Sequence, residues 1–241
     1  MMTASGTELD IRQFRYSRDN LAYLVYGGGS AVAIDGGAVE EILTFVADNN
    51  LVLRYVTHTH QHADHTCGTR ELAAATGARP LDFGSISADE LLPWEGAADI
   101  EVWPAPGHTL DSVVFKIGSV LISGDTLFNG TVGNCFSGDL HSFYHTIQRI
   151  MELDDDTVIY AGHDYVRESI AFARHLEREN AALDGYLARY DAGWVRSTLG
   201  MERTVNPYLR FNEPALVRLM EKRGLAVASE YDRWQGVMHL D

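Results

Sequence analysis

Four histidines and one aspartate are gathered in the stretch VTHTHQHADHT at residues 56–66. Imidazole nitrogens and carboxylate oxygens are the ordinary protein ligands of zinc, iron and manganese. In an extended segment, residues two positions apart point the same way, so His60 and His62 can bind one ion. If the chain then turns into a helix, Asp64 and His65 project to the other side and can hold a second ion. The stretch therefore predicts a specific metal site for divalent ions.

Three further candidate ligands follow apolar strands elsewhere in the chain. His108 follows a glycine in APGHT, Asp125 follows one in LISGD, and His163 follows one in VIYAGHD. Glycine permits the tight turn that exposes the next side chain at a strand end. We expect two divalent metal ions, with zinc as the first choice and iron or manganese as alternatives that accept the same ligands. His58, farther back in the strand, is expected to lie behind the ligands or to pack.

Strands and interspersed helices must position these ligands. Short apolar runs rich in β-formers predict strands at residues 21–28, 31–37 and 51–57, three more within about 100–125, and one that ends at His163. Helical spacing predicts helices at residues 38–50, 69–78 and 139–153. Beyond about residue 166 the chain is expected to be mostly helical, with a break around residues 197–207.

This order of elements predicts a layered α/β sandwich rather than a single parallel sheet. We place the catalytic domain at residues 1–165 and a mostly helical C-terminal region at residues 166–241. The length of 241 residues suits one large domain with an appendage.

The charge and composition of the chain disfavour several kinds of binding partner and cellular location. Nineteen basic against 34 acidic residues give a formal net charge of −15, which disfavours nucleic acid and anionic membranes. We expect no membrane span, because no run of about 18 apolar residues is present. The first residues lack the apolar run of a signal peptide, and two cysteines cannot build a disulfide framework, so we expect a cytoplasmic protein. The oligomeric state stays open.

The motifs carry a family resemblance. THQHADH at residues 59–65 fits the Thr-His-x-His-x-Asp-His signature of the metallo-β-lactamase superfamily, and the three strand-end ligands follow in that family's order. Nearly the whole chain resembles the glyoxalase II branch, the hydroxyacylglutathione hydrolases, through DNLAYLV, GDTLF, GHDY, FARHLERENAAL and STLGMERTVNPYLR. The resemblance implies an αββα sandwich with the metals at one edge of its two sheets. It also implies that the C-terminal helices complete the substrate site.

The resemblance assigns a role to each ligand. The first ion would be held by His60, His62 and His108. The second ion would be held by Asp64, His65 and His163, with Asp125 bridging the two. The implied activity is hydrolysis of a small-molecule thioester or thiol conjugate by a hydroxide that the two ions share, with Asp64 as a catalytic proton relay.

The residues expected to bind the glutathione part of a substrate depart from the family pattern. Tyr165 in GHDY keeps its family type, but Asn134 stands at a usually basic position and Phe136 replaces a frequent tyrosine. Near the C-terminus, Ala228 and Tyr231 stand where the family has arginine and lysine. Three cationic partners for glutathione carboxylates are therefore missing, unless other residues substitute for them.

Other hypotheses remain open. A persulfide dioxygenase, which uses one iron ion and oxygen on the same scaffold, carries the same ligand motifs, and GHDY favours that interpretation. Against it, the arginine-bearing loop typical of that family does not follow GDTLF. A metallo-hydrolase of another substrate class and a non-catalytic protein on the same fold are the remaining alternatives.

Overall fold

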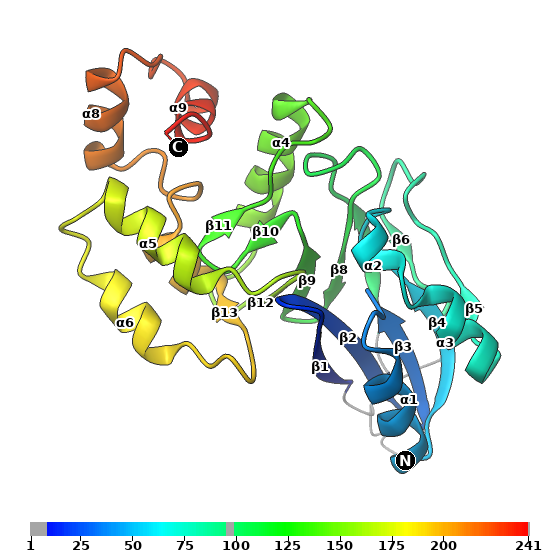
Figure 1. Cartoon of the computed structure of the whole chain (residues 1–241). Coiled ribbons are helices and arrows are strands. Elements are labelled where there is room, and N and C mark those ends of the chain that lie inside the picture. The colour runs from blue at the N-terminus through cyan, green and yellow to red at the C-terminus, as the bar shows by residue number, and fades with distance from the viewer. Residues whose placement is uncertain (1–8, 95–98, 241) are drawn as a thin grey trace, which may run out of the picture.

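Two β-sheets lie face to face in the computed structural model, which describes residues 9–94 and 99–240 (Figure 1). The first sheet has the order β1-β2-β3-β4-β5, in which β1 to β3 are antiparallel neighbours and β3 to β5 run parallel. Its strands are β1 (Asp10–Tyr16), β2 (Asn20–Gly27), β3 (Ser30–Ile34), β4 (Val52–Thr57) and β5 (Arg79–Pro80).

The second sheet has the order β13-β12-β9-β8-β7-β6, with β9 and β12 parallel and the other neighbours antiparallel. Its strands are β6 (Glu90–Leu91), β7 (Glu101–Pro104), β8 (Val113–Ile117), β9 (Val120–Gly124), β12 (Val158–Ala161) and β13 (Ser197–Thr198). A small hairpin of β10 (Leu127–Phe128) and β11 (Thr131–Val132) follows β9.

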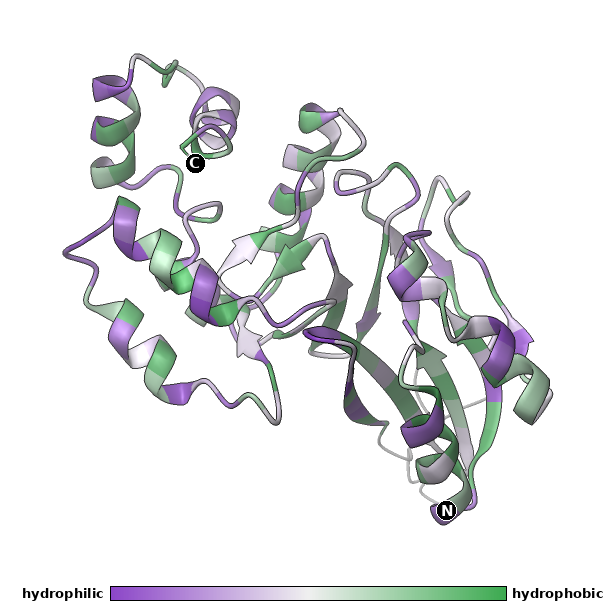
Figure 2. Ribbon diagram, viewed as in Figure 1, coloured by the Kyte–Doolittle hydropathy of each residue, from purple (hydrophilic) through white to green (hydrophobic). Residues whose placement is uncertain are grey.

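Strand β2 shows why the sheets stack. Side chains alternate between the two faces of a strand, and both faces of β2 are apolar. Leu21 and Tyr23 pack in the core between the sheets, whereas Ala22 and Leu24 face the helices α1 (Val39–Asp48) and α3 (Thr69–Thr76). A strand that is apolar on both faces must be covered on both, and in Figure 2 the ribbon of β2 is coloured largely as hydrophobic.

A second helical layer covers the outer face of the second sheet. Helix α4 (Leu140–Met151) begins after Asp139, whose side chain accepts a hydrogen bond from the backbone N–H of Ser142. Its buried residues Phe143 and Ile147 pack with Leu121 of β9. The layers therefore run helix, sheet, sheet, helix, which confirms the predicted αββα sandwich.

The C-terminal region forms five helices within residues 166–240. They are α5 (Val166–Leu176), α6 (Ala182–Arg189), α7 (Leu199–Val205), α8 (Pro214–Lys222) and α9 (Glu230–Val237). The fully buried Glu202 of α7 joins them to the sandwich, because its carboxylate accepts hydrogen bonds from the Tyr186 hydroxyl and from the backbone N–H of Gly130. None of the helices in the described ranges is long and apolar enough to cross a membrane.

Most of the expected elements are present. The strands expected at 21–28, 31–37 and 51–57 correspond to β2, β3 and β4, and the expected helices correspond to α1, α3 and α4. Strand β1 was not predicted. The predicted break at 197–207 is wrong for most of its length, because Thr198 caps α7 by accepting a hydrogen bond from the N–H of Met201.

Candidate metal centre

The seven candidate ligands lie at one edge of the sandwich, where several strands end. Asp125 follows β9 and His163 follows β12, and these strands are parallel neighbours, so their carboxyl ends meet. The loop after β4 carries the histidine run, and its Thr59 carbonyl accepts a hydrogen bond from the N–H of Val113 at 2.8 Å. This bond holds the end of β4 against the start of β8, next to the loop that carries His108.

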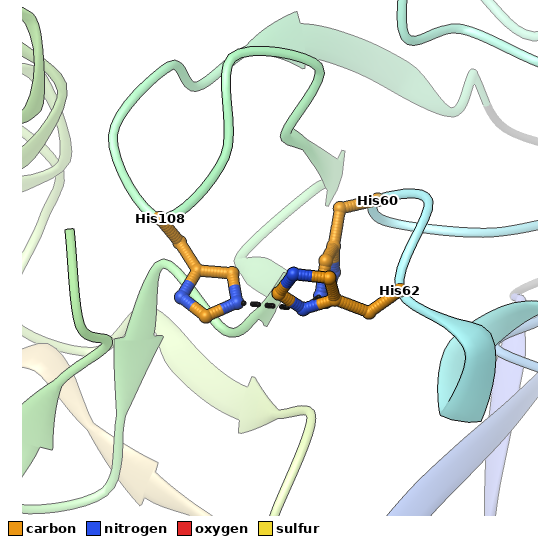
Figure 3. Close-up of side chains that lie close together, drawn as sticks. All are labelled: His60, His62 and His108. Atoms are coloured by element: carbon orange, nitrogen blue, oxygen red, sulfur yellow. Dashed lines mark hydrogen bonds between the residues drawn. The ribbon is translucent and has the colours of Figure 1, made fainter. Parts of the chain in front are cut away.

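A first group contains His60, His62 and His108 (Figure 3). Nε2 of His60 lies 2.8 Å from Nδ1 of His62, and Nε2 of His108 lies 3.2 Å from the same atom. The three rings come from two loops and point toward one another (Figure 3). His62 thus presents Nδ1 to the centre, whereas its two partners present Nε2.

A second group contains Asp64, His65 and His163. Nε2 of His65 and Nε2 of His163 lie 3.3 Å apart. Oδ2 of Asp64 lies 3.4 Å from Nε2 of His163 and 3.7 Å from Nε2 of His65. The side chains of Asp64 and His65 are brought to this side by the short helix α2 (Ala63–Thr66), as the sequence suggested.

Asp125 lies between the two groups. Its Oδ2 is 3.5 Å from Nε2 of His108 and 3.5 Å from Nε2 of His163, so one oxygen faces both groups. Its Oδ1 is 3.4 Å from Nε2 of His65 and is a buried atom with no hydrogen-bond partner among the described residues. An orphaned carboxylate oxygen inside a ring of imidazoles is the environment that a cation would complete.

The donor set fits divalent metal ions. Two ligand atoms at about 2.05 Å from one tetrahedral ion lie roughly 3.3 Å apart. The 3.2 Å between His62 and His108 and the 3.3 Å between His65 and His163 are close to that value, and the 2.8 Å between His60 and His62 is shorter. Burial lowers the pKa of His60 to about 3, so its imidazole is in the neutral form that binds metal.

The carboxylates inside the centre are held ionised. Burial opposes the charge of Asp125, but the imidazoles of His163 and His65 outweigh it and hold its pKa well below the usual range. Burial also lowers the pKa of His65, yet Asp35 and Asp125 outweigh it and raise that pKa to about 11. A metal ion that binds Nε2 of His65 therefore displaces a proton.

In four of the candidate histidines, the ring nitrogen that points away from the centre lies close to a polar partner. Nδ1 of His163 lies 2.9 Å from Oδ1 of Asp19, and Nδ1 of His65 lies 2.9 Å from Oδ2 of Asp35. Nδ1 of His108 donates to the Asn134 carbonyl at 2.9 Å, and Nδ1 of His60 lies 3.1 Å from the Thr59 hydroxyl. Such contacts orient a ligand ring and fix its tautomer. Sequence reasoning missed Asp19 and Asp35, whose only signal is a carboxylate at a strand end.

Two glycines allow the close approach that the centre requires. A Cβ atom on Gly162 would lie 2.2 Å from Oδ1 of Asp125 and 2.8 Å from Cε1 of His65. A Cβ atom on Gly133 would lie 2.8 Å from Nδ1 of His108. Neither position accepts a side chain without displacing a candidate ligand.

Three residues that were predicted to bind substrate lie beside the candidate ligands. Tyr165 stacks on His163, with ring centroids 5.0 Å apart and an interplanar angle of 5°. Phe136 is 66% exposed, and its ring centroid lies 5.2 Å from that of His108. The side chain of Asn134 is exposed, while its backbone orients His108.

No cationic side chain replaces the arginine and lysine of the family at Ala228 and Tyr231. Ala228 is exposed, and the ring of Tyr231 packs 5.5 Å from that of Tyr144. Arg233 is engaged within the helical region, where Nε donates to the Asn212 side chain at 2.7 Å and Nη1 donates to a backbone carbonyl. Among the described residues, His58 belongs to none of the three groups of potential metal ligands.

Sequence comparisons match the chain from near its N-terminus to residue 235. The model of the metallo-beta-lactamase superfamily matches residues 17–81 and 87–163, and the model of the hydroxyacylglutathione hydrolase C-terminus matches residues 164–235. A hydroxyacylglutathione hydrolase of Anaeromyxobacter dehalogenans is 38% identical, covering 84% of this chain and 86% of that protein. One of Chromohalobacter salexigens is 31% identical, covering 86% and 89%.

Solved structures share the fold. ETHE1 from Myxococcus xanthus superposes with a TM-score of 0.66 at 24% identity, covering 94% of this chain and 99% of that chain. A metallo-beta-lactamase from Staphylococcus aureus gives a TM-score of 0.65 at 19% identity, covering 95% and 70%. At such identities the likeness concerns the architecture alone.

Proposed function

The chain belongs to the metallo-β-lactamase superfamily, in the branch of the hydroxyacylglutathione hydrolases, and on that premise we propose that it hydrolyses a thioester bond in a metal-dependent reaction. The observation that carries this proposal is the convergence of five imidazoles and two carboxylates at one edge of the sandwich. The family match over residues 164–235 supports the thioester class, because it covers the region expected to complete the substrate site.

We propose two divalent ions, zinc first, with iron or manganese as alternatives. His60, His62 and His108 would hold the first ion. Asp64, His65 and His163 would hold the second, and Asp125 would be shared. When bound, such ions polarise the thioester carbonyl and lower the pKa of the attacking water. The central position of Asp125, 3.5 Å from a histidine of each group, supports its bridging role.

Asp64 is the residue that we propose to transfer protons near the reacting carbonyl, and a neighbouring side chain holds it in position. Oδ2 of Asp64 accepts a hydrogen bond from Nδ2 of Asn20 at 2.9 Å, which fixes the carboxylate beside His163. Burial opposes ionisation of Asp64, but Asn20 and then His65 outweigh it and lower its pKa, so Asp64 is in the ionised form that a proton relay requires. We propose that it relays the proton of the attacking water to the leaving thiolate.

The substrate is proposed to lie over the exposed side of this centre. The ring of Phe136 lies beside that of His108, and the ring of Tyr165 stacks on that of His163. Asn134, next to Gly133 in the chain, is exposed. We propose that these three residues contact the substrate, with residues 1–165 supplying the chemistry and residues 166–241 completing the site. A thioester suits such a site because its thiolate leaves readily once the carbonyl is attacked.

A panel assay tests the proposal. Purified protein, with its metal content measured, is given an uncharged acyl-N-acetylcysteamine thioester, an acyl-glutathione, an acyl-CoA and a lactam. Glutathione persulfide is tested in parallel with an oxygen electrode. We expect metal-dependent cleavage of thioesters. Oxygen uptake with the persulfide and no thioester cleavage would replace hydrolysis by the dioxygenase alternative.

A further inference from the structure

Each of the two β-sheets supplies part of the candidate metal centre, so the loops that carry the ligands must be held together across the sandwich. His60 and His62 follow β4 of the first sheet, whereas His108 lies between β7 and β8 of the second. Figure 3 shows these three side chains converging from two separate loops. Two ligand atoms of one tetrahedral ion lie only roughly 3.3 Å apart. A small shift of one loop against the other therefore separates His108 from its two partners.

Asp111 forms a contact that joins these two loops beside the first group. It follows His108 in the same loop, and its Oδ2 accepts a hydrogen bond from the backbone N–H of Gln61 at 2.9 Å. Gln61 stands in the chain between His60 and His62. The contact therefore runs from the loop of one candidate ligand to the residue between the other two.

A short neighbouring segment holds both partners of this contact in place. A Cβ atom on Gly84 would lie 2.9 Å from Cβ of Asp111, so the backbone of Gly84 packs directly against that side chain. In the same segment, Oδ2 of Asp82 accepts a hydrogen bond from Nε2 of Gln61, and its Oδ1 accepts one from the N–H of Gly84, both at 2.9 Å. Gln61 is thus held through its backbone by Asp111 and through its side chain by Asp82.

The second group has separate connections between the sheets. The N–H of Leu21 in β2 donates to the Gly162 carbonyl at 2.8 Å. The N–H of Asp164 donates to the Asp19 carbonyl at 2.9 Å. The side chain of Asp19 also lies 2.9 Å from Nδ1 of His163. Removal of the contact beside the first group leaves these connections in place.

We propose that Asp111 is the positioning residue of the first metal group, and that it holds His60 and His62 at the distance from His108 that a single ion requires. The inference rests on the metal centre of the proposed hydrolase and assigns to it a residue outside the proposed ligand set. The hydrogen bond between the loop after β4 and the start of β8 does not involve this side chain. Loss of the carboxylate therefore loosens the ligand loop without separating the sheets, and its effect falls on the first ion.

The ring of His62 reports on the first group alone. Among the candidate histidines, His62 presents Nδ1 to the centre, whereas His60, His108, His65 and His163 present Nε2. A ring that binds metal through Nδ1 carries its proton on Nε2, and nitrogen NMR spectra of the imidazole rings distinguish it from rings that bind through Nε2. These spectra therefore show when the first group is occupied, whatever the activity of the protein.

A zinc titration tests the positioning role. Zn²⁺ is added to metal-free wild type, Asp111→Ala and Asp111→Asn in competition with a chelator, and the spectra are recorded at each step. In Asp111→Ala one of two equivalents should bind about tenfold more weakly, the low end of the effect of losing a contact behind a ligand. The ring bound through Nδ1 should appear only with that weaker equivalent. Asp48→Ala, exposed at the end of α1, is the matched control and should bind like wild type.

Two further variants make the outcome specific. Asp111→Asn keeps an oxygen that can accept the N–H of Gln61, so it should bind zinc more tightly than Asp111→Ala. Asp19→Ala removes the partner of His163 in the second group, so it should weaken the other equivalent, and the ring bound through Nδ1 should appear first. Weakening of both equivalents alike in Asp111→Ala, or of neither, would overturn the proposal. Equal zinc binding by Asp111→Ala and Asp111→Asn would also overturn it.

Failure of this inference is distinguishable from failure of the proposed function. Cleavage of the uncharged N-acetylcysteamine thioester by wild type, with zinc bound alike by wild type and Asp111→Ala, would overturn the positioning role and keep the hydrolase. Selective weakening of the first group in Asp111→Ala, without cleavage of any thioester by wild type, would keep the positioning role and reject the hydrolase.

Discussion

Nδ1 of His65 lies 2.9 Å from Oδ2 of Asp35, and neither side chain is exposed to solvent. Asp35 also accepts hydrogen bonds from the backbone N–H and the hydroxyl of Thr59, at 2.7 and 2.9 Å. The hydroxyl of Thr59 in turn lies 3.1 Å from Nδ1 of His60. One buried carboxylate therefore supports a histidine of each proposed metal group, although no sequence pattern singles out Asp35.

Asp35→Asn should weaken metal binding while the fold persists. The amide keeps the size of the carboxylate but loses the charge that orients His65. Loss of such a contact lowers metal affinity by about 10- to 100-fold. We expect the metal content to fall under a fixed concentration of chelator, measured by elemental analysis with circular dichroism as the control for folding. Unchanged content in that competition would show that Asp35 is only a packing residue.

Asp125→Ala should lower metal content and thioester turnover more than the substitution of any single candidate histidine. Its two oxygens lie within 3.5 Å of His65, His108 and His163, so one substitution removes a donor from both groups. We expect the loss of both metals and of essentially all thioester turnover. His58→Ala, which removes a histidine of the run after β4 that belongs to none of the groups of potential ligands, is the control, and it should retain its metals. Near-normal activity of Asp125→Ala would reject the bridging role.

Gly162→Ala should disturb the centre through contact alone. The new methyl group would lie 2.2 Å from Oδ1 of Asp125, a distance that real Cβ atoms do not tolerate. We expect at least a tenfold fall in metal affinity, because a shift of the carboxylate breaks its alignment with both groups. Gly185→Ala, where a Cβ meets no atom within 4 Å, is the control. Equal metal affinity of the two variants would show that the centre adapts freely.

Glu202 should stabilise the junction between sandwich and helices in a pH-dependent way. Burial raises its pKa above the ordinary value of 4.5, and hydrogen bonds from Ser197 and Tyr186 oppose that rise. A raised folded-state pKa means that the contribution to stability is full below 4.5 and declines as the pH rises through the folded-state pKa. The free energy of unfolding of wild type, relative to Glu202→Gln, should therefore fall in urea titrations as the pH rises above 4.5. A constant difference would contradict the shift.

Glu202→Ala should be more severe than Glu202→Gln. Alanine leaves the donors of Gly130 and Asn206 without their acceptor and opens a cavity, which costs roughly 3–5 kcal/mol. Glutamine keeps one acceptor oxygen for these donors, and its N–H₂ group can donate to the hydroxyls of Tyr186 and Ser197. The same urea titrations at pH 7 measure both variants. Equal stability of the two would show that the hydrogen-bond network contributes little.

The sequence singled out the candidate ligands but not the residues that contact them from behind, for a physical reason. Metal chemistry requires particular residue types at short spacings, so the run from His60 to His65 is visible locally. Asp19 and Asp35 act through contacts that only the folded chain creates, with His163 and His65 respectively. A single aspartate near a strand end has no pattern of its own.

Two features of the fold were predicted incorrectly, each for its own reason. Strand β1, DIRQFRY, mixes charged and apolar residues, and only Gln13 is fully buried, so the apolar run that marked the other strands is missing. The predicted break at residues 197–207 includes Gly200 and Pro207, but α7 runs from Leu199 to Val205 and Pro207 lies beyond its end. Gly200 is held in the helix while its N–H donates to the Asp155 carbonyl at 2.9 Å.

The most direct test of metal-dependent thioester hydrolysis is removal and return of the metal. Wild-type protein is stripped with a chelator, its residual metal is quantified, and cleavage of the uncharged N-acetylcysteamine thioester is followed while Zn²⁺, Fe²⁺ or Mn²⁺ is added stepwise. The account predicts no cleavage in the stripped protein and recovery that saturates at about two equivalents of metal per chain. Full activity with less than one tenth of an equivalent of metal bound would contradict it.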